Sequence, residues 1–182
     1  MSVKSVGESI TRVDAPGKVK GETEYSGDLS MPGLLHMKML FAGRPHARVK
    51  SLRIEAAEKL AGVVAVFTSK DVPVNEYGLQ IQDQPVLCGP SATPPQGVAT
   101  DIVRFEGDQV AAVVAETESI AAEAVKLIEV EYEDLPAVFD AAAGMQPDAP
   151  QLHPELADSN ICVHYKIRKG DVDSAFANAD VI

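Results

Sequence analysis

The first regular pattern along the chain is an alternation of apolar and polar side chains over residues 34–41. Met37 and Phe41 take one side of this stretch, and His36 and Lys38 take the other. A period of two is typical of a strand with one face in the core and one in water. We therefore expect a strand here, with the Met37 side buried and the His36 side solvated.

Two more strands and a short helix are predicted in the next part of the chain. A weaker alternation over residues 49–54 sets Val49 and Leu52 on opposite sides of a strand. Helix-forming residues over 55–61 predict a short helix. The β-branched and apolar run that follows, residues 63–68, predicts a buried strand.

The clearest helix of the chain is expected between two strands. Residues 102–105 and 110–115 are apolar runs separated by a tight turn, which predicts a hairpin. Residues 118–128 carry apolar side chains at helical spacing, and Thr117 can cap this helix. Residues 129–133 then alternate again, with one acidic face. A strand, a helix and a strand in this order predict a right-handed crossover.

Several segments lack strong patterns. Glycine, proline and charge over residues 1–33 predict an irregular arm, and prolines interrupt regular structure over residues 75–101. Residues 161–168 alternate as a last strand, and residues 172–178 predict a short helix. Residues 180–182 have the pattern of an opening strand, so we expect the natural chain to continue beyond them.

Together these elements indicate an α+β (mixed α/β) fold, with a mixed sheet, a few short helices and long Pro-rich loops. Three parts are expected. They are an arm over 1–33, a core over 34–140, and a linker with the start of a following region over 141–182. Hydrophobic residues make up 46% of the 182 residues, which is enough for one packed core.

The charge balance narrows the range of partners. With 27 acidic against 16 basic residues, the formal net charge is -11. Such a surface repels phosphate backbones and anionic lipid, so we expect no nucleic-acid and no membrane partner. No apolar run approaches the ~20 residues that a membrane helix needs, and the N-terminus lacks an apolar signal core. A cytoplasmic protein is therefore expected.

Motifs of known chemistry are missing from the sequence. It has no glycine-rich dinucleotide fingerprint, no phosphate-binding loop and no nucleophile elbow. Cys88 and Cys162 lie outside any Cys-x-x-Cys pair, which disfavours a zinc or iron–sulfur site. A nucleophilic role is disfavoured for both cysteines, and Cys162 has the apolar neighbours of a packed side chain. A disulfide between them remains open.

The four histidines, His36, His46, His153 and His164, show no metal-ligand spacing. We interpret His36 as solvated on the polar face of its strand. His46, which lies between a proline and an alanine, is interpreted as orienting its loop through a hydrogen bond.

A row of carboxylates follows the predicted helix. Glu129, Glu131, Glu133 and Asp134 could hold calcium or supply an acid–base pair. Outward positions of a strand are more often a solvated face, and we favour that interpretation. A calcium-binding module is kept as an alternative.

Short motifs follow one another along nearly the whole chain. They are RVDAPGKVKG at 12–21, YSGD at 25–28, PHARV at 45–49, GVVAV at 62–66, DVP at 71–73, QPVL at 84–87, GDQVA at 107–111, VEYEDLPAV at 130–138, and GDVDSAF at 170–176. Their order resembles the opening of molybdenum hydroxylase large subunits, which include xanthine dehydrogenase, aldehyde oxidase and carbon monoxide dehydrogenase enzymes. Gln109 departs from the family, which often has proline there, and this affects only a turn.

The resemblance implies an N-terminal α/β-hammerhead domain of a molybdopterin-binding large subunit. The intact enzymes of the family oxidise small organic substrates, such as aldehydes and N-heterocycles, with oxygen taken from water. They do so at molybdenum held by a pterin dithiolene, and iron–sulfur clusters and usually FAD lie on partner subunits or domains. In the family, the pterin-contacting segments and the glutamate base lie C-terminal to this domain. The resemblance therefore assigns no catalytic, cofactor-binding or metal-binding residue to this chain.

The expected role is structural. The intact subunit would be an oxidoreductase, and the 182-residue chain alone is expected to be inactive and to bind no cofactor. Its partners would be the remainder of the subunit and the iron–sulfur and FAD subunits or domains. Residues 1–33 and 75–101 are either contact segments or simple flexible loops. The alternative is a stand-alone binding or scaffold domain.

Overall fold

The computed structural model describes residues 7–79, 81–90 and 97–182. Its contacts divide the chain into two compact units, Met1–Leu35 and His36–Ile182. Each unit is described below by itself.

The first unit contains two short helices, α1 (Ala15–Lys20) and the single 3-10 turn η1 (Ser26–Asp28). Pro16 stands in the first turn of α1, where its fixed φ suits a helix and its missing N–H costs nothing. Gly21 ends α1 in the left-handed conformation, with φ 71. The prediction of an irregular arm is therefore wrong over these residues.

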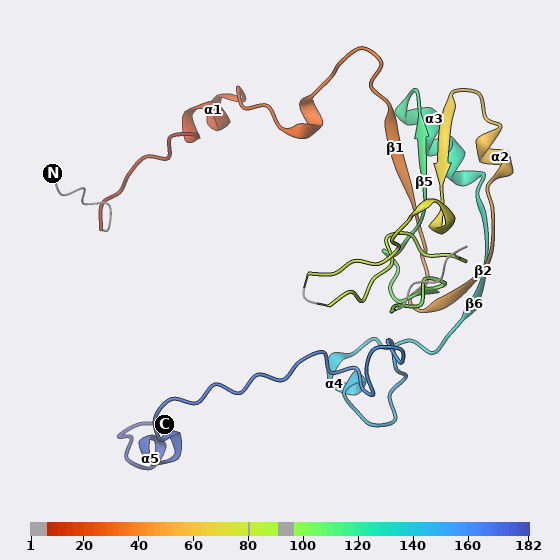
Figure 1. Ribbon diagram of the computed structural model, residues 1–182. Coiled ribbons are helices and arrows are strands. Elements are labelled where there is room, and N and C mark those ends of the chain that lie inside the picture. Colours follow the sequence, from red (N-terminus) through yellow and green to blue (C-terminus); the bar gives the residue numbers. More distant parts are fainter. Residues whose placement is uncertain (1–6, 80, 91–96) are drawn as a thin grey trace. The chain divides into compact units, whose positions relative to one another are not determined.

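The second unit contains two three-stranded antiparallel sheets (Figure 1). In the first sheet, β5 (Gln109–Ala115) lies between β1 (His36–Phe41) and β3 (Val63–Phe67). This sheet is called sheet A. Its central strand is almost fully buried after the exposed Gln109, because it is apolar from Val110 onward and has a neighbour on each edge.

Sheet B has the order β4-β2-β6. Here β2 (Ala47–Arg53) pairs on one side with the short β4 (Ile102–Val103) and on the other with β6 (Glu129–Asp134). The fold class, strands combined with a few short helices, is confirmed.

Two predicted connections are wrong. The strands β4 and β5 do not form a hairpin, because β4 pairs with β2 while β5 pairs with β1 and β3. The segment β5–α3–β6 is not a crossover within one sheet, because β5 belongs to sheet A and β6 to sheet B. Periodicity identifies which face of a strand is apolar but carries no information on the neighbouring strand.

The helices are short. Between β2 and β3 lies α2 (Glu55–Glu58), and α3 (Glu118–Lys126) joins the two sheets. As predicted, Thr117 caps α3: its side-chain oxygen accepts from the Ile120 N–H. The other helical segments are the 3-10 turn η2 (Ser69–Asp71), α4 (Ala141–Gly144) and α5 (Val172–Ala177).

One hydrophobic cluster joins sheet A to its two helices. It combines residues of α2 and α3 with those of β3 and β5, and Leu40, Leu52 and Val130 pack at its border. The buried members are Ala57, Val66, Ala111, Val113, Ala124 and Ile128. The helices thus cover one face of sheet A, which leaves the other face free of them.

A bulge changes the phase of β2. The register shifts between Val49 and Ser51, so one extra residue is inserted on this strand. As a result Val49 and Leu52 both pack toward the core, opposite Tyr132 and Val130 of β6. The prediction that they lie on opposite sides is wrong, because simple alternation assumes an unbroken strand.

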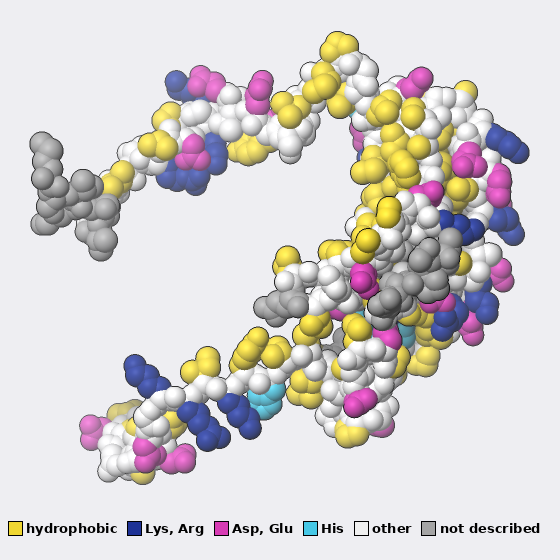
Figure 2. All heavy atoms as spheres, in the orientation of Figure 1, with side chains coloured by type: hydrophobic (Ala, Val, Ile, Leu, Met, Phe, Trp, Pro, Cys, Tyr) yellow, Lys and Arg dark blue, Asp and Glu magenta, His cyan; other side chains and the backbone are white. Residues whose placement is uncertain are grey.

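The two edge strands of sheet A expose apolar side chains, contrary to prediction. Met37 on β1 is 61% exposed, and Val64 and Phe67 on β3 are 55% and 44% exposed. Figure 2 shows hydrophobic atoms gathered over this part of the molecule. The Met37 side of β1 and most of β3 are therefore not buried within this chain.

Met37 faces outward because the helix α3 covers the opposite face of sheet A. Lys38 stands opposite Val113 on the α3 side of the sheet, and its ammonium lies 2.5 Å from the carboxylate of Glu118. The stem of a lysine can lie along an apolar surface while its charge reaches water. The stem of Lys38 therefore lies at the border of the core, where an apolar side chain is usual, and its neighbour Met37 faces outward.

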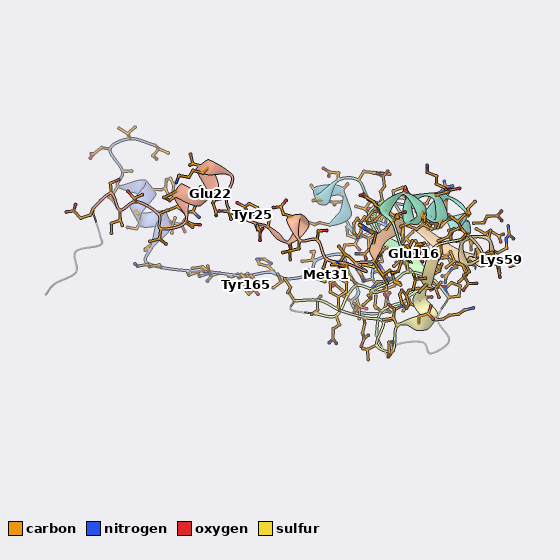
Figure 3. All side chains as sticks on the ribbon, turned by 90° about the horizontal axis from the view of Figure 1, so that it is seen from above. Glu22, Tyr25, Met31, Lys59, Glu116 and Tyr165 are labelled. Carbon is orange, nitrogen blue, oxygen red and sulfur yellow. The ribbon has the colours of Figure 1, made fainter. Side chains whose placement is uncertain are left out.

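None of residues 161–168 lies in a strand, although their alternation predicts one, and all of them are exposed. Tyr165, labelled in Figure 3, lies on a stretch without helix or strand. Residues 180–182 form no strand either. An extended segment without a neighbour leaves its N–H and C=O groups to water, so alternation alone does not make it a strand.

No helix among the described residues is long and apolar enough to cross a membrane.

Candidate functional site

The proline-rich loop, residues 75–101, contributes to the core through a buried amide. The Asn75 side chain is 4% exposed. Its Nδ2 donates to the carbonyl of Leu87 at 2.8 Å, and its Oδ1 accepts from the Leu87 N–H at 3.0 Å. One side chain thereby satisfies both backbone groups of a buried residue. These two bonds hold Asn75 beside Leu87 within the loop.

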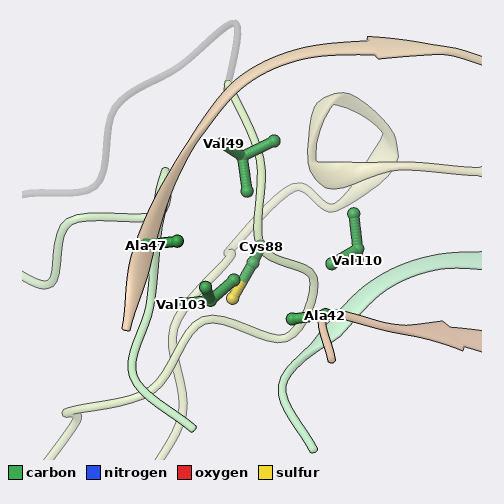
Figure 4. Packing of buried hydrophobic residues seen from close by; sticks show 6 residues of the cluster. All are labelled: Ala42, Ala47, Val49, Cys88, Val103 and Val110. Carbon is green, nitrogen blue, oxygen red and sulfur yellow. The ribbon is translucent and has the colours of Figure 1, made fainter. Parts of the chain in front are cut away.

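Cys88, in the same loop, is fully buried. Figure 4 shows its side chain among Ala47, Val103 and Val110. Its backbone N–H donates to the carbonyl of Gln109 at 2.6 Å, so the loop is attached to the start of β5. Burial raises the pKa of the Cys88 thiol well above its usual range. A thiol held neutral in an apolar core is a packing residue and a poor nucleophile or metal ligand.

Cys162 is exposed, so the prediction of a packed side chain is wrong. Both cysteines are free thiols, one buried and one exposed, which answers the open question of a disulfide.

His46 has the structural role predicted for it. The side chain is 6% exposed, and its Nδ1 lies 2.6 Å from the carbonyl oxygen of Pro136. The carbonyl of His46 in turn accepts from the Leu135 N–H at 2.9 Å. His46 therefore joins the start of β2 to the segment after β6.

The carboxylate row on β6 is matched by polar side chains on and beside β2. The Lys50 ammonium lies 3.1 Å from Glu133, and the Ser51 hydroxyl donates to Glu131 at 3.0 Å. The remaining pairs are Arg53 with Glu129 and Arg44 with Asp134. Calcium takes six to eight oxygen ligands around one point, whereas these carboxylates are spread along a strand. Across the described ranges no three His, Cys, Asp or Glu side chains could share a metal ion.

A cavity with a volume of about 920 Å³ lies between the proline-rich loop and the segment after α4. Its polar lining includes Glu76, Asp83, His153 and Asn160. The segment after α4 is itself ordered by Asn160, whose amide donates to the carbonyls of Gly144 and Pro150.

Arg104 connects this segment to β4. Its guanidinium side chain is only 9% exposed and lies 2.5 Å from the carboxylate of Glu155. It also donates to the carbonyls of Leu152 at 2.7 Å, Ile102 at 3.3 Å and Ala99 at 3.4 Å. The guanidinium therefore makes four hydrogen bonds within its own domain, as expected of a side chain that is mostly buried. Arg104 is thus a structural cross-link between β4 and the segment after α4.

Asp108 closes the turn before β5. Its Oδ2 accepts from the backbone N–H of Arg104 at 2.5 Å and of Phe105 at 3.3 Å. Burial raises the pKa of the Asp108 carboxyl, although these two donors act in the opposite direction.

His153, at the edge of the cavity, is half-buried, and its Nδ1 is the one buried side-chain nitrogen or oxygen of the described residues that has no hydrogen-bond partner. Its Nδ1 lies 3.8 Å from Glu155. Burial and the nearby Arg104 lower the pKa of this histidine, which disfavours its charged form. Among the described residues no serine or cysteine side chain is hydrogen-bonded to His153, although Ser159 and Cys162 also line the cavity.

The cavity does not fit an anionic pterin dithiolene. Glu76 and Asp83 face it with negative charge, and its described lining contains no lysine or arginine. No chemical step is therefore assigned to the residues of this chain.

Sequence reasoning missed the residues that organise this region, namely Asn75, Arg104, Asp108 and Glu155. Each has the appearance of an ordinary surface residue in the sequence. The only signal was the Gly-Asp turn that contains Asp108. Arg104 and Glu155 are 51 residues apart, and no local pattern pairs them.

The sequence profile of the aldehyde oxidase and xanthine dehydrogenase a/b hammerhead domain matches residues 20–136. The chain belongs to this family. It is 43% identical over 96% of its length to a probable xanthine dehydrogenase subunit of Bacillus subtilis. It is 33% identical over 97% of its length to the nicotinate dehydrogenase large molybdopterin subunit of Eubacterium barkeri. The hammerhead resemblance inferred from the motifs is thereby confirmed.

Solved structures agree with the sequence comparison. The aldehyde oxidoreductase of Desulfovibrio gigas superposes with a TM-score of 0.69 at 30% identity, over 93% of this chain and 19% of that one. The hammerhead chain spans 22% of the Bacillus relative and 39% of the Eubacterium relative. Most of each relative therefore lies outside the part that corresponds to this domain.

Proposed function

We propose that this hammerhead domain is the N-terminal structural and interface domain of a molybdenum-dependent hydroxylase or dehydrogenase subunit. The intact enzyme oxidises a small organic substrate, such as an aldehyde or an N-heterocycle, with oxygen derived from water. The observation that carries the proposal is the family match over residues 20–136, together with relatives that are named as dehydrogenase subunits.

The arrangement of the polar groups supports a structural role. The buried polar side chains Asn75, Arg104 and Asp108 bind backbone groups and a carboxylate of their own domain. A catalytic site instead presents unpaired or activated groups to a cavity that fits the substrate. Catalytic, cofactor-binding and metal-binding residues are accordingly proposed to lie outside this chain.

The remaining assignments follow from the same proposal. Molybdopterin is held by the rest of the subunit, and iron–sulfur clusters and usually FAD by partner subunits or domains. The enzyme is placed in the cytoplasm, with no nucleic-acid or membrane partner. The proposed parts are the arm 1–33, the hammerhead core 34–140, and the linker with the start of the molybdenum-binding region over 141–182.

The direct test is to determine the gene sequence downstream of the codon for Ile182. An open frame of several hundred further residues that matches the relatives beyond their hammerhead domain is the expected result. Purification of the whole product should then give a protein that contains molybdenum. A frame that stops at this codon overturns the proposal and leaves a stand-alone binding domain.

A further inference from the structure

The cavity between the proline-rich loop and the segment after α4 plays no part in the structural role proposed above. Most of its lining comes from the first part of the loop, residues 76–79 and 81–83, and from within residues 152–162. Its volume of about 920 Å³ lies in the range of small-molecule sites, about 300–1,000 Å³. The cavity is therefore large enough for a small organic ligand.

A short hairpin presents two carboxylates to this cavity. Tyr77 and Gln84 exchange backbone hydrogen bonds of 2.7 and 3.2 Å, so they stand opposite each other on antiparallel chains. Side chains alternate along each chain and opposite residues share a face, so Glu76 and Asp83 lie on the same face of the hairpin. Both carboxylates are half-buried, and both line the cavity.

The lining has an excess of negative charge. No lysine or arginine belongs to its described part. Burial lowers the pKa of His153, which disfavours a positive charge at this position. Arg104 lies outside the lining and pairs with Glu155, so its charge is largely offset. A ligand with a positive charge is therefore attracted to the cavity.

The apolar part of the lining determines what kind of cation fits. Leu152, Leu156 and Ile161 add hydrocarbon surface, which favours a ligand with a carbon body over a hydrated ion. No three His, Cys, Asp or Glu side chains in the described ranges could share a metal ion, so a bare metal cation does not fit. The matching ligand combines a charged group with an apolar body.

We propose that this cavity binds a small organic cation, an ammonium or amidinium group on an apolar body, with the charge beside Glu76 and Asp83. Charge attracts the ligand, and burial of its apolar part holds it. The proposal goes beyond the structural role and does not depend on it, because residues of this chain form the site.

Three probes of similar size and different charge test the proposal. At about pH 7.5, 4-phenylbutylamine is a cation, 4-phenylbutanol is neutral and 4-phenylbutyrate is an anion. Isothermal titration calorimetry measures their binding to the full-length gene product. The amine should bind about fivefold or more tightly than the alcohol, and the butyrate should bind most weakly.

Variants of the lining locate the binding site. Glu76→Gln combined with Asp83→Asn removes both charges and keeps the side-chain shapes, so amine binding should weaken about fivefold or more, to that of the alcohol. Glu123→Gln combined with Asp173→Asn changes the net charge equally at exposed positions outside the lining, and should leave amine binding unchanged. Leu156→Lys adds a positive charge to the lining and should weaken amine binding independently.

The outcomes are distinct. An advantage of the amine that is lost in both lining variants but kept in the control supports the proposal. Equal binding of the three probes, no binding of the amine, or amine binding that neither lining variant weakens overturns it. If the frame ends at Ile182, the proposed function fails, but the same titration still decides this inference on the 182-residue protein.

Discussion

At the scale of single residues, buried polar side chains connect segments that are far apart in the sequence. Asn75 fixes a loop, Arg104 connects β4 to the segment after α4, and His46 joins β2 to the residues after β6. Each forms bonds mostly to backbone groups. Removal of such a side chain leaves a buried donor or acceptor unpaired, which costs more than the bond itself contributes.

Substitution of Asn75 should reveal this cost. In Asn75→Ala the N–H and the carbonyl of Leu87 lose their partners in a buried position. We expect the free energy of unfolding to fall by about 1–3 kcal/mol, measured by urea denaturation. The matched control is Asn178→Ala at the exposed end of α5, which should change the free energy of unfolding by less than about 0.5 kcal/mol. Equal effects of the two substitutions would contradict the assigned role.

His153 should make stability depend on pH. Burial lowers the pKa of this histidine, so the unfolded chain binds more protons than the folded one near and below the ordinary histidine pKa of about 6.5. The free energy of unfolding should therefore decrease as the pH falls from about 7.5 to about 5.5. Urea denaturation across this range should show a smaller decrease for His153→Gln. His164→Gln, at an exposed position, is the control and should follow the parent profile.

At the scale of elements, a helix or strand was predicted correctly where its own sequence carries a strong hydrophobic pattern. Prediction failed where the structure depends on which strand lies beside it. The helix α3 was predicted from its spacing and its cap, and β5 from its continuous apolar run. The pairing of β4 with β2, the bulge in β2 and the exposed side of β1 were not predictable. Residues 161–168 have a strand pattern but no neighbour. The candidate site shows the same limit, since its chemistry depends on contacts such as that between Arg104 and Glu155.

The cap of α3 offers a test at this scale. Thr117→Ala removes the oxygen that accepts from the Ile120 N–H, and should lower the free energy of unfolding by about 0.5–2 kcal/mol. Thr117→Ser keeps a hydroxyl at the same place and should restore most of the loss in thermal or urea denaturation. If alanine and serine behave alike, the hydrogen bond does not stabilise the helix.

At the scale of the whole molecule, the described residues form a hammerhead domain without a catalytic constellation. We expect the 182-residue chain, purified alone, to contain no stoichiometric molybdenum by elemental analysis and to show no cofactor absorbance in the visible range. The whole subunit, purified with its partners, is the positive control. Molybdopterin bound in equal amount to the short chain would contradict the structural role proposed for it.

The strand order also determines when this domain can form during synthesis. The middle strand of sheet A, β5, follows both of its neighbours in the chain, and the middle strand of sheet B, β2, precedes both of its own. On the ribosome β1 and β3 therefore emerge without a partner, and sheet B is incomplete until β6 has emerged. Folding has to await residue 134, because local contacts alone complete neither sheet. Until residue 115 has emerged, the nascent chain presents two apolar strands without their central partner, and such unpaired strands are prone to aggregate.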